Sequence, residues 1–271
     1  MILEQIYSKF RRKPSISYDD TLIPPAERIF VGNPDIVDFK EHGQVYLETL
    51  IKEGQLKPYE TVLDVGCGIG RIAAPLTQYL KTGRYEGFDI VPHGIKWCRH
   101  QITPKYPHFN FQLADLYNKF YNPTGSQPAI TYQFPYSQET FDLIFLASVF
   151  THMVPPDMEN YLGEVNRVLK IGGRCLISFF LFNPKTLYLL NDHRRIGKLK
   201  FEYDYDHYRL EDFNEAESAI AYEESFIRNL YQKNGLKIIK TRYGTWRNYQ
   251  KNPVAKGQDI VVALKNNNIR K

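Results

Sequence analysis

The feature that most constrains the fold is a repeated alternation of short apolar runs with helical stretches from residue 61 onward. The runs are rich in β-branched and aromatic residues, and such alternation is typical of a largely parallel sheet covered by helices. Seven strands are predicted, at 61–65, 84–89, 110–113, 141–147, 173–180, 237–243 and 259–265. Helices are predicted between them at 71–80, 94–102, 158–169 and 216–234.

Two further helices are predicted before the first strand. Apolar residues at helical spacing over residues 1–10 indicate a short amphipathic helix that ends before Pro14. Asn33 followed by Pro34 has the form of an N-cap with proline at the first helical position, so a second helix is expected to begin there. Two connections are unusually long, at 116–140 and 182–215, and loops of that length in a compact domain are usually functional or disordered.

Composition excludes several classes of protein. Apolar residues make up 43% of the chain and charged residues 24%, which is unlike a disordered or membrane-embedded chain. No apolar run approaches the ~20 residues of a bilayer-crossing helix, and the N-terminus lacks a signal-peptide pattern. The three cysteines, Cys67, Cys98 and Cys175, have no metal-ligand spacing and cannot all pair in disulfides. A cytoplasmic location without a metal is therefore expected.

The chain is basic, with a net charge of +5 and a pI near 8.9, which makes contact with phosphates mildly favourable. Lysine and arginine are spread along the whole chain, with one short cluster at residues 11–13. We interpret this charge as ordinary solvated surface, with a nucleic-acid footprint as the alternative. No specific nucleic-acid partner is expected.

The strongest local signal is the run VLDVGCGIGR at residues 62–71, in which an apolar strand breaks into alternating glycines before a helix. Glycine permits positive φ and lets a ligand approach the main chain, while the helix start offers unpaired N–H groups. The dinucleotide pattern G-x-G-x-x-G requires a small residue at the position that Arg71 occupies. This departure disfavours a nicotinamide or flavin dinucleotide.

Four more blocks follow the later strands. Asp89 ends the second strand about 20 residues on, where a carboxylate can accept hydrogen bonds from ribose hydroxyls, although a helix N-cap is the alternative. Asp115 follows the third strand, where it can accept from the exocyclic amine of adenine. The fourth block is FDLIFLAS at 141–148, followed by VFTHM, and the fifth is EVNRVLKIGGR at 164–174.

These five blocks, in this order and at these spacings, resemble the class I S-adenosylmethionine-dependent methyltransferases over roughly residues 60 to 180. The resemblance implies a seven-stranded Rossmann-like α/β sheet with helices on both faces, strand order 3-2-1-4-5-7-6 and an antiparallel last strand. It implies S-adenosyl-L-methionine as cofactor and S-adenosyl-L-homocysteine as product. One domain is expected over 1–271: an N-terminal helical cap at 1–58, a cofactor-binding core at 59–181, an insertion or lid at 182–215, and a C-terminal helix with the last two strands at 216–271.

The resemblance also implies the cofactor contacts. Gly66 and Gly68 would lie against the methionine part, and Asp64 would organise its ammonium group through the loop. Asp89 would hold the ribose, and Asp115 and Leu116 would frame the adenine. Cys67 is expected to fill a tight turn rather than to react. The complete expected set is Asp64, Gly66, Cys67, Gly68, Asp89, Ile90, Asp115, Leu116, Ala147 and Ser148.

The catalytic and acceptor residues are less constrained by the sequence. His152 directly follows the fourth strand, so a general base and a structural histidine are both plausible interpretations. Pro155 and Pro156 lack the flanking residues of the nucleobase amino-methyltransferase motif and are interpreted as a helix start. Aromatic and cationic groups after strands five and six suit a polar acceptor that stacks on rings, with lid packing as the alternative. The acceptor candidates are Tyr205, His207, Tyr208, Trp246 and Arg247.

The leading hypothesis is methyl transfer to an oxygen or nitrogen atom of a small polar organic acceptor. Methylation of RNA or protein is the alternative, motivated by the basic pI. A cofactor-binding module without catalysis is the third hypothesis. The insertion 182–215, together with the N-terminal helix, is expected to close over the acceptor and exclude water.

Overall fold

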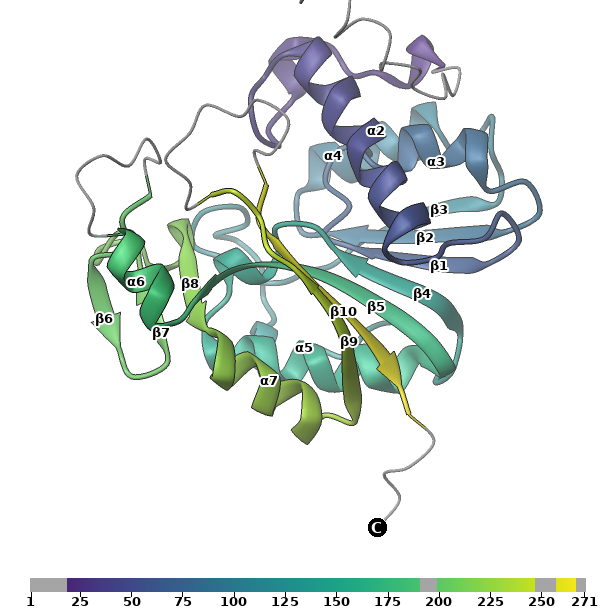
Figure 1. Ribbon diagram of the computed structural model, residues 1–271. Helices are drawn as coiled ribbons and strands as arrows, with labels where there is room; N and C mark the ends of the chain where they lie inside the picture. The colour runs from purple at the N-terminus through teal and green to yellow at the C-terminus, as the bar shows by residue number, and fades with distance from the viewer. Residues whose placement is uncertain (1–18, 191–198, 247–256, 267–271) are drawn as a thin grey trace, which may run out of the picture.

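The computed structural model describes residues 19–190, 199–246 and 257–266. Its centre is a sheet whose first five strands are parallel neighbours in the order β3-β2-β1-β4-β5 (Figure 1). The bounds of these strands are β1 Thr61–Val65, β2 Arg84–Asp89, β3 Phe109–Leu113, β4 Phe141–Leu146 and β5 Leu169–Phe182. The bounds of β1 and β2 match the prediction, those of β3 and β4 differ from it by one residue, and β5 extends beyond its predicted range at both ends.

The last two predicted strands complete the sheet beyond β5. β10 (Asp259–Lys265) is antiparallel to β5 and lies between β5 and β9 (Leu236–Arg242). Counting β9 and β10 as the sixth and seventh predicted strands, the order is 3-2-1-4-5-7-6 with an antiparallel last strand. The fold class expected from the resemblance is therefore confirmed.

Helices cover both faces of this sheet (Figure 1). On one face, Leu47 of α2, Leu76 of α3 and Ile95 of α4 belong to one buried apolar cluster. On the other face, Leu162 of α5 and Ile227 of α7 belong to a second cluster. The helices are α2 Ile36–Lys52, α3 Ala73–Tyr79, α4 Pro92–Gln101, α5 Pro155–Val168, α6 Pro184–Leu190 and α7 Glu224–Lys233. Short 3-10 turns are η1 Asp20–Leu22, η2 Ala26–Arg28, η3 Ala129–Thr131, η4 Phe150–His152 and η5 Ala216–Ser218.

The prediction of one helix over 216–234 is wrong. The described chain contains three strands that were not predicted: β6 (Tyr203–Tyr205), β7 (Tyr208–Leu210) and β8 (Ile220–Glu223). β8 pairs in parallel with the carboxyl end of β5, and β6 and β7 form a hairpin that continues the sheet from β8. Three consecutive buried residues in β8 fit a strand covered on both faces, whereas a surface helix buries one stripe. The helix starts only at α7.

Two predictions near the N-terminus have different outcomes. Helix α2 begins at Ile36 rather than at Pro34, because the carboxylate of Asp35 caps it by accepting from the N–H of Asp38 at 2.8 Å. The amphipathic helix predicted over residues 1–10 lies outside the described residues. None of the helices that the structure describes is both long and apolar enough to cross a membrane.

Candidate functional site

A cavity of about 460 Å³ lies at the carboxyl ends of β1, β2 and β4. In an open sheet of parallel strands, ligands bind at this edge. The walls come from the loop after β1, the ends of β2 and β4, the loop after β3, the start of α5, and η5 before β8. One cavity thus joins segments that are far apart in the sequence.

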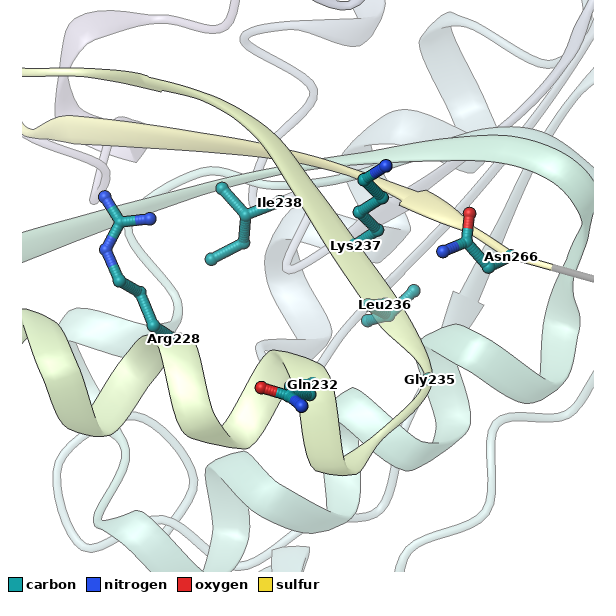
Figure 2. A pocket seen from close by; sticks show the side chains of 7 residues that line it. All are labelled: Arg228, Gln232, Gly235, Leu236, Lys237, Ile238 and Asn266. Atoms are coloured by element: carbon teal, nitrogen blue, oxygen red, sulfur yellow. The ribbon is translucent and has the colours of Figure 1, made fainter. Parts of the chain in front are cut away.

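A second hollow, of about 310 Å³, lies between α7 and the start of β9 (Figure 2). Arg228 and Gln232 project from α7 toward it, and Lys237 and Ile238 belong to β9. The Arg228 guanidinium is already paired with Glu224 at 2.6 Å. Because this hollow is at the amino end of β9, it lies at the opposite edge of the sheet from the first cavity. The candidate site is therefore the first cavity.

Glycine shapes the loop between β1 and α3. Gly66, Gly68 and Gly70 have φ values of 78°, 58° and 84°, in the left-handed region that disfavours residues with a Cβ. A Cβ on Gly66 would lie 2.5 Å from Cγ2 of Val149. The loop is also tied to β2, because the N–H of Gly66 donates to the carbonyl of Phe88 at 2.9 Å. Gly66 and Gly68 both line the cavity.

Asp89 joins the end of β2 to this loop. Its Oδ2 accepts from the N–H of Gly68 at 2.7 Å, and its Oδ1 accepts from the N–H of Val91 at 2.9 Å. Burial raises the pKa of Asp89, and these two backbone hydrogen bonds oppose that rise. The Asp89 side chain lines the cavity, and each of its oxygens accepts one backbone hydrogen bond. Each oxygen therefore keeps a further lone pair that can accept from a ligand.

Two predicted cofactor residues do not line the cavity. Asp64 is buried in β1, where its Oδ2 accepts from the Tyr85 hydroxyl at 2.7 Å. Its Oδ1 is buried without a hydrogen-bond partner among the described residues, and desolvation raises the pKa of Asp64 to about 8. The Asp115 carboxylate accepts from the hydroxyl and the N–H of Ser126, which closes the loop after β3. Its neighbour Leu116 does line the cavity.

The other predicted cofactor residues lie at the cavity. Cys67, Ile90, Ala147 and Ser148 all line it. Cys67 is a free thiol whose pKa is raised well above its ordinary value by burial, which fits packing rather than reaction. Ser148 has a φ of 61°, and its N–H donates to the Ser178 hydroxyl at 2.7 Å. That bond helps to hold the turn after β4 in a conformation that is uncommon for a residue other than glycine.

His152 lines the cavity from η4, immediately before α5. Its Nδ1 lies 2.8 Å from the main-chain carbonyl oxygen of Glu217. Because a carbonyl only accepts, Nδ1 carries the hydrogen and Nε2 of the neutral ring carries a lone pair. Burial lowers the pKa of His152, which favours the neutral ring. The geometry therefore provides what a general base requires at Nε2.

The predicted acceptor residues lie elsewhere. Tyr205 and Tyr208 stack on each other at 5.0 Å in the hairpin of β6 and β7, and His207 stacks on Phe226. The indole of Trp246 donates to Asp259 at 2.8 Å. None of these four predicted side chains, all within the described part of the chain, is among those that line the cavity. Arg247 lies outside the described residues.

Comparison with known proteins identifies the core. Residues 63–177 match the family model described as a methyltransferase domain. They contain the glycine loop, Asp89 and the turn that carries His152. Over this segment the chain is similar to methyltransferase domains, in line with the resemblance of its sequence blocks to the class I S-adenosylmethionine-dependent methyltransferases.

Curated relatives match the methyltransferase domain over part of their length. The chain is 29% identical over 150 residues to methyltransferase GfsG of Streptomyces halstedii, covering 54% of this chain and 47% of that protein. It is 32% identical over 114 residues to a phthiotriol/phenolphthiotriol dimycocerosates methyltransferase of Mycobacterium leprae, covering 41% of this chain and 34% of that protein. The chain therefore spans less than half the length of these relatives.

Solved structures share the fold. A S-adenosylmethionine-dependent methyltransferase from Clostridium acetobutylicum matches 84% of this chain and 92% of its own length, with a TM-score of 0.53 and 17% identity. The magnesium protoporphyrin IX methyltransferase of Synechocystis, solved with bound S-adenosylhomocysteine, matches 84% of both chains, with a TM-score of 0.52 and 16% identity. At these identities the likeness concerns the fold of the methyltransferase domain.

Several residues that line the cavity were not among the sequence candidates. Tyr121 comes from the long loop after β3, and its ring meets the His152 ring edge-on at 5.9 Å. Glu217 comes from η5, and Asp157 and Tyr161 come from α5. The length of the loop was a usable signal for Tyr121. The spacing of Asp157 and Tyr161 by four residues, directly after the turn that follows the fourth strand, was a usable signal for α5.

Proposed function

We propose that this protein transfers the methyl group of S-adenosylmethionine to an oxygen or nitrogen atom of a small polar organic acceptor. One observation carries the proposal: a single cavity joins the glycine loop and Asp89 to a neutral, oriented His152. The mycobacterial relative is named as a methyltransferase of phthiotriol and phenolphthiotriol dimycocerosates. That name favours a small-molecule acceptor over RNA or protein.

The residues at the cavity fit the cofactor. The left-handed glycines leave the main chain open where a Cβ would intrude. The buried Oδ1 of Asp64, in the strand before the loop, has no hydrogen-bond partner in the part of the chain that the structure describes. Gly66 and Gly68 would hold the methionine part, which Asp64 would influence through the loop. Asp89 would accept from the ribose hydroxyls, and Leu116 would pack beside the adenine. When bound, S-adenosylmethionine supplies a methyl group activated by its sulfonium charge.

The residues of the cavity would align the two reactants and supply a proton acceptor. The walls of the cavity would hold the cofactor and the acceptor in the alignment that displacement at the methyl carbon requires. Such alignment can lower the activation free energy by up to about 7–11 kcal/mol. His152 can take a proton at Nε2 from an acceptor that must lose one, because Nδ1 is held by the Glu217 carbonyl. The ring of Tyr121 packs edge-on against the imidazole.

Two experiments test the proposal. Calorimetry with S-adenosylmethionine, S-adenosylhomocysteine and NAD should show binding of the two adenosyl ligands in preference to NAD. Incubation of the purified chain with cell extract and S-adenosylmethionine should yield small-molecule products heavier by one methylene group in mass spectrometry. Tight NAD binding without binding of either adenosyl ligand would contradict the proposed function, and methylation confined to RNA or protein would contradict the acceptor class.

A further inference from the structure

Two polar side chains on α5 face the cavity without a partner. Asp157 lies in the first turn of α5 and Tyr161 lies four residues later, so both project from one face of the helix. Both line the cavity, and Tyr161 is only 4% exposed. Among the described residues, neither the Asp157 carboxylate nor the Tyr161 hydroxyl makes a hydrogen bond or ion pair. The Tyr161 side chain is almost fully buried, whereas Asp157 is half-buried and close enough for its charge to act on Tyr161. Their unpaired oxygens at the cavity wall are therefore placed to meet a ligand.

The charges around this pair are mostly negative. Glu217 also lines the cavity, and burial and the negative charge of Asp157 raise the pKa of Glu217. The main chain and the positive charge of Lys119, which does not line the cavity, oppose that rise. Burial raises the pKa of Asp157 as well. Of the described residues that line the cavity, Arg71 is the one with a permanent positive charge, and its guanidinium donates to the carbonyl of Val31 beside the glycine loop. The α5 end of the cavity therefore has carboxylates without a cation from the cavity wall.

The Asp157–Tyr161 pair and the expected cofactor contacts come from different segments of the chain, although the charge of Asp89 reaches Tyr161. Asp89, Gly66 and Gly68 come from the loops after β1 and β2, whereas Asp157 and Tyr161 follow η4 and His152. The pair thus stands on the same segment as the proposed base. A group bound there would belong to the acceptor.

We propose that the acceptor carries an amine, and that its ammonium group is bound by the Asp157 carboxylate and the Tyr161 hydroxyl. An ammonium group donates to both oxygens and supplies the positive charge that this end of the cavity lacks. Because an ammonium nitrogen has no lone pair, it anchors the acceptor, and the methylated atom is a different atom, nearer His152. This proposal rests on the proposed function, because it names the class of acceptor for the same site.

A pair of matched probes tests the charge preference. Tyramine and tyrosol share the same phenol ring and two-carbon chain, and they differ in an ammonium group against a hydroxyl. Their dissociation constants are measured by calorimetry on the whole chain, saturated with S-adenosylhomocysteine, at neutral pH. Tyramine is expected to bind at least about tenfold more tightly than tyrosol, as expected for a buried charge-assisted hydrogen bond. Equal binding, tighter binding of tyrosol, or no binding of tyramine overturns the proposal.

Three variants assign the preference to residues. Asp157→Asn keeps the shape and removes the charge, so tyramine affinity should fall to that of tyrosol while tyrosol affinity stays unchanged. Tyr161→Phe should reduce tyramine affinity severalfold. Glu159→Gln is the matched control, because it removes a carboxylate from the same helix where Glu159 pairs with Lys233 outside the cavity. Preference for tyramine that survives in Asp157→Asn, or that is lost equally in Glu159→Gln, overturns the assignment.

The binding of S-adenosylhomocysteine separates the two proposals. Its affinity is measured first in the unmodified chain and in each variant, and it should be the same in all four proteins. No binding in the unmodified chain contradicts the proposed methyl transfer, whatever the probes do. Normal binding together with no preference for tyramine contradicts the amine proposal alone.

Discussion

The imidazole of His152 donates from Nδ1 to the main-chain carbonyl of Glu217 across 65 positions of sequence, at 2.8 Å. This bond joins η4, directly after β4, to η5, directly before β8. It fixes the ring orientation and assigns the hydrogen to Nδ1, so the lone pair stays on Nε2. The η5 segment therefore helps to determine which nitrogen of His152 carries the hydrogen.

Replacement of His152 by glutamine should lower turnover by roughly 10²–10⁴-fold if the acceptor must lose a proton, which is the usual contribution of a general base. The dissociation constant of S-adenosylhomocysteine should stay unchanged. In the unmodified protein, burial lowers the pKa of His152, so the rate should fall only when the pH drops below the ordinary range of histidine. Steady-state kinetics against pH measure both effects. Full activity of His152→Gln would exclude a base at this position.

Asp89→Ala should weaken binding of S-adenosylhomocysteine by roughly 1–3 kcal/mol, because the variant loses hydrogen bonds from a charged acceptor. Asp89 also holds the N–H groups of Gly68 and Val91, so part of the loss comes from a looser loop. Asp89→Asn keeps one carbonyl acceptor and should lose less. Calorimetry gives the affinities, and melting temperature checks the fold. An unchanged dissociation constant in Asp89→Ala would reject the ribose role.

Gly66→Val should abolish cofactor binding in a domain that still folds. The backbone at Gly66 is left-handed, and even a Cβ would lie 2.5 Å from Val149. Gly163→Ala, within α5, is the control. Its added Cβ would lie 3.5 Å from Oδ1 of Asn234, which is an ordinary van der Waals contact. Circular dichroism and calorimetry on both variants compare folding with binding. Normal affinity in Gly66→Val would place the cofactor elsewhere.

Asp64→Asn should stabilise the cofactor-free protein at alkaline pH. The folded pKa of Asp64 is raised to about 8 by desolvation, from an ordinary 3.8. Below pH 3.8, Asp64 is protonated in both the folded and the unfolded protein. Between pH 3.8 and about 8, Asp64 is ionised in the unfolded protein but protonated in the folded one, so the free energy of unfolding falls as the pH rises. The Asp64→Asn variant removes this slope, so its stability advantage over the unmodified protein should grow by roughly 4 kcal/mol between about pH 5 and pH 8. Denaturant unfolding of both proteins at several pH values measures the difference in their free energies of unfolding. A difference that stays constant with pH contradicts the raised pKa of Asp64.

The strands of the core could be predicted from the sequence because their signals are local. β1, β2 and β10 match their predicted bounds, since buried apolar runs flanked by turns specify strands within a few residues. The glycine loop is local in the same sense, because left-handed φ at Gly66 and Gly68 is a property of glycine itself. The placement of Asp89 beside Gly68 follows from two parallel neighbouring strands ending at the same edge.

The tertiary structure decided those features that depend on pairing between residues far apart in the sequence. Residues 220–223 form β8 because the long β5 offers an edge at Phe180–Phe182, and that edge replaces a helix that local pattern favoured. The same pairing brings Glu217 to His152. The spacing of Asp157 and Tyr161 indicates a shared helix face, but only the packing of α5 decides that this face lines the cavity. The sequence thus determined the seven predicted strands, the glycine loop and the place of Asp89. Long-range pairing determined the added strand β8 and the contact of Glu217 with His152, because these meet through contacts that no local periodicity encodes.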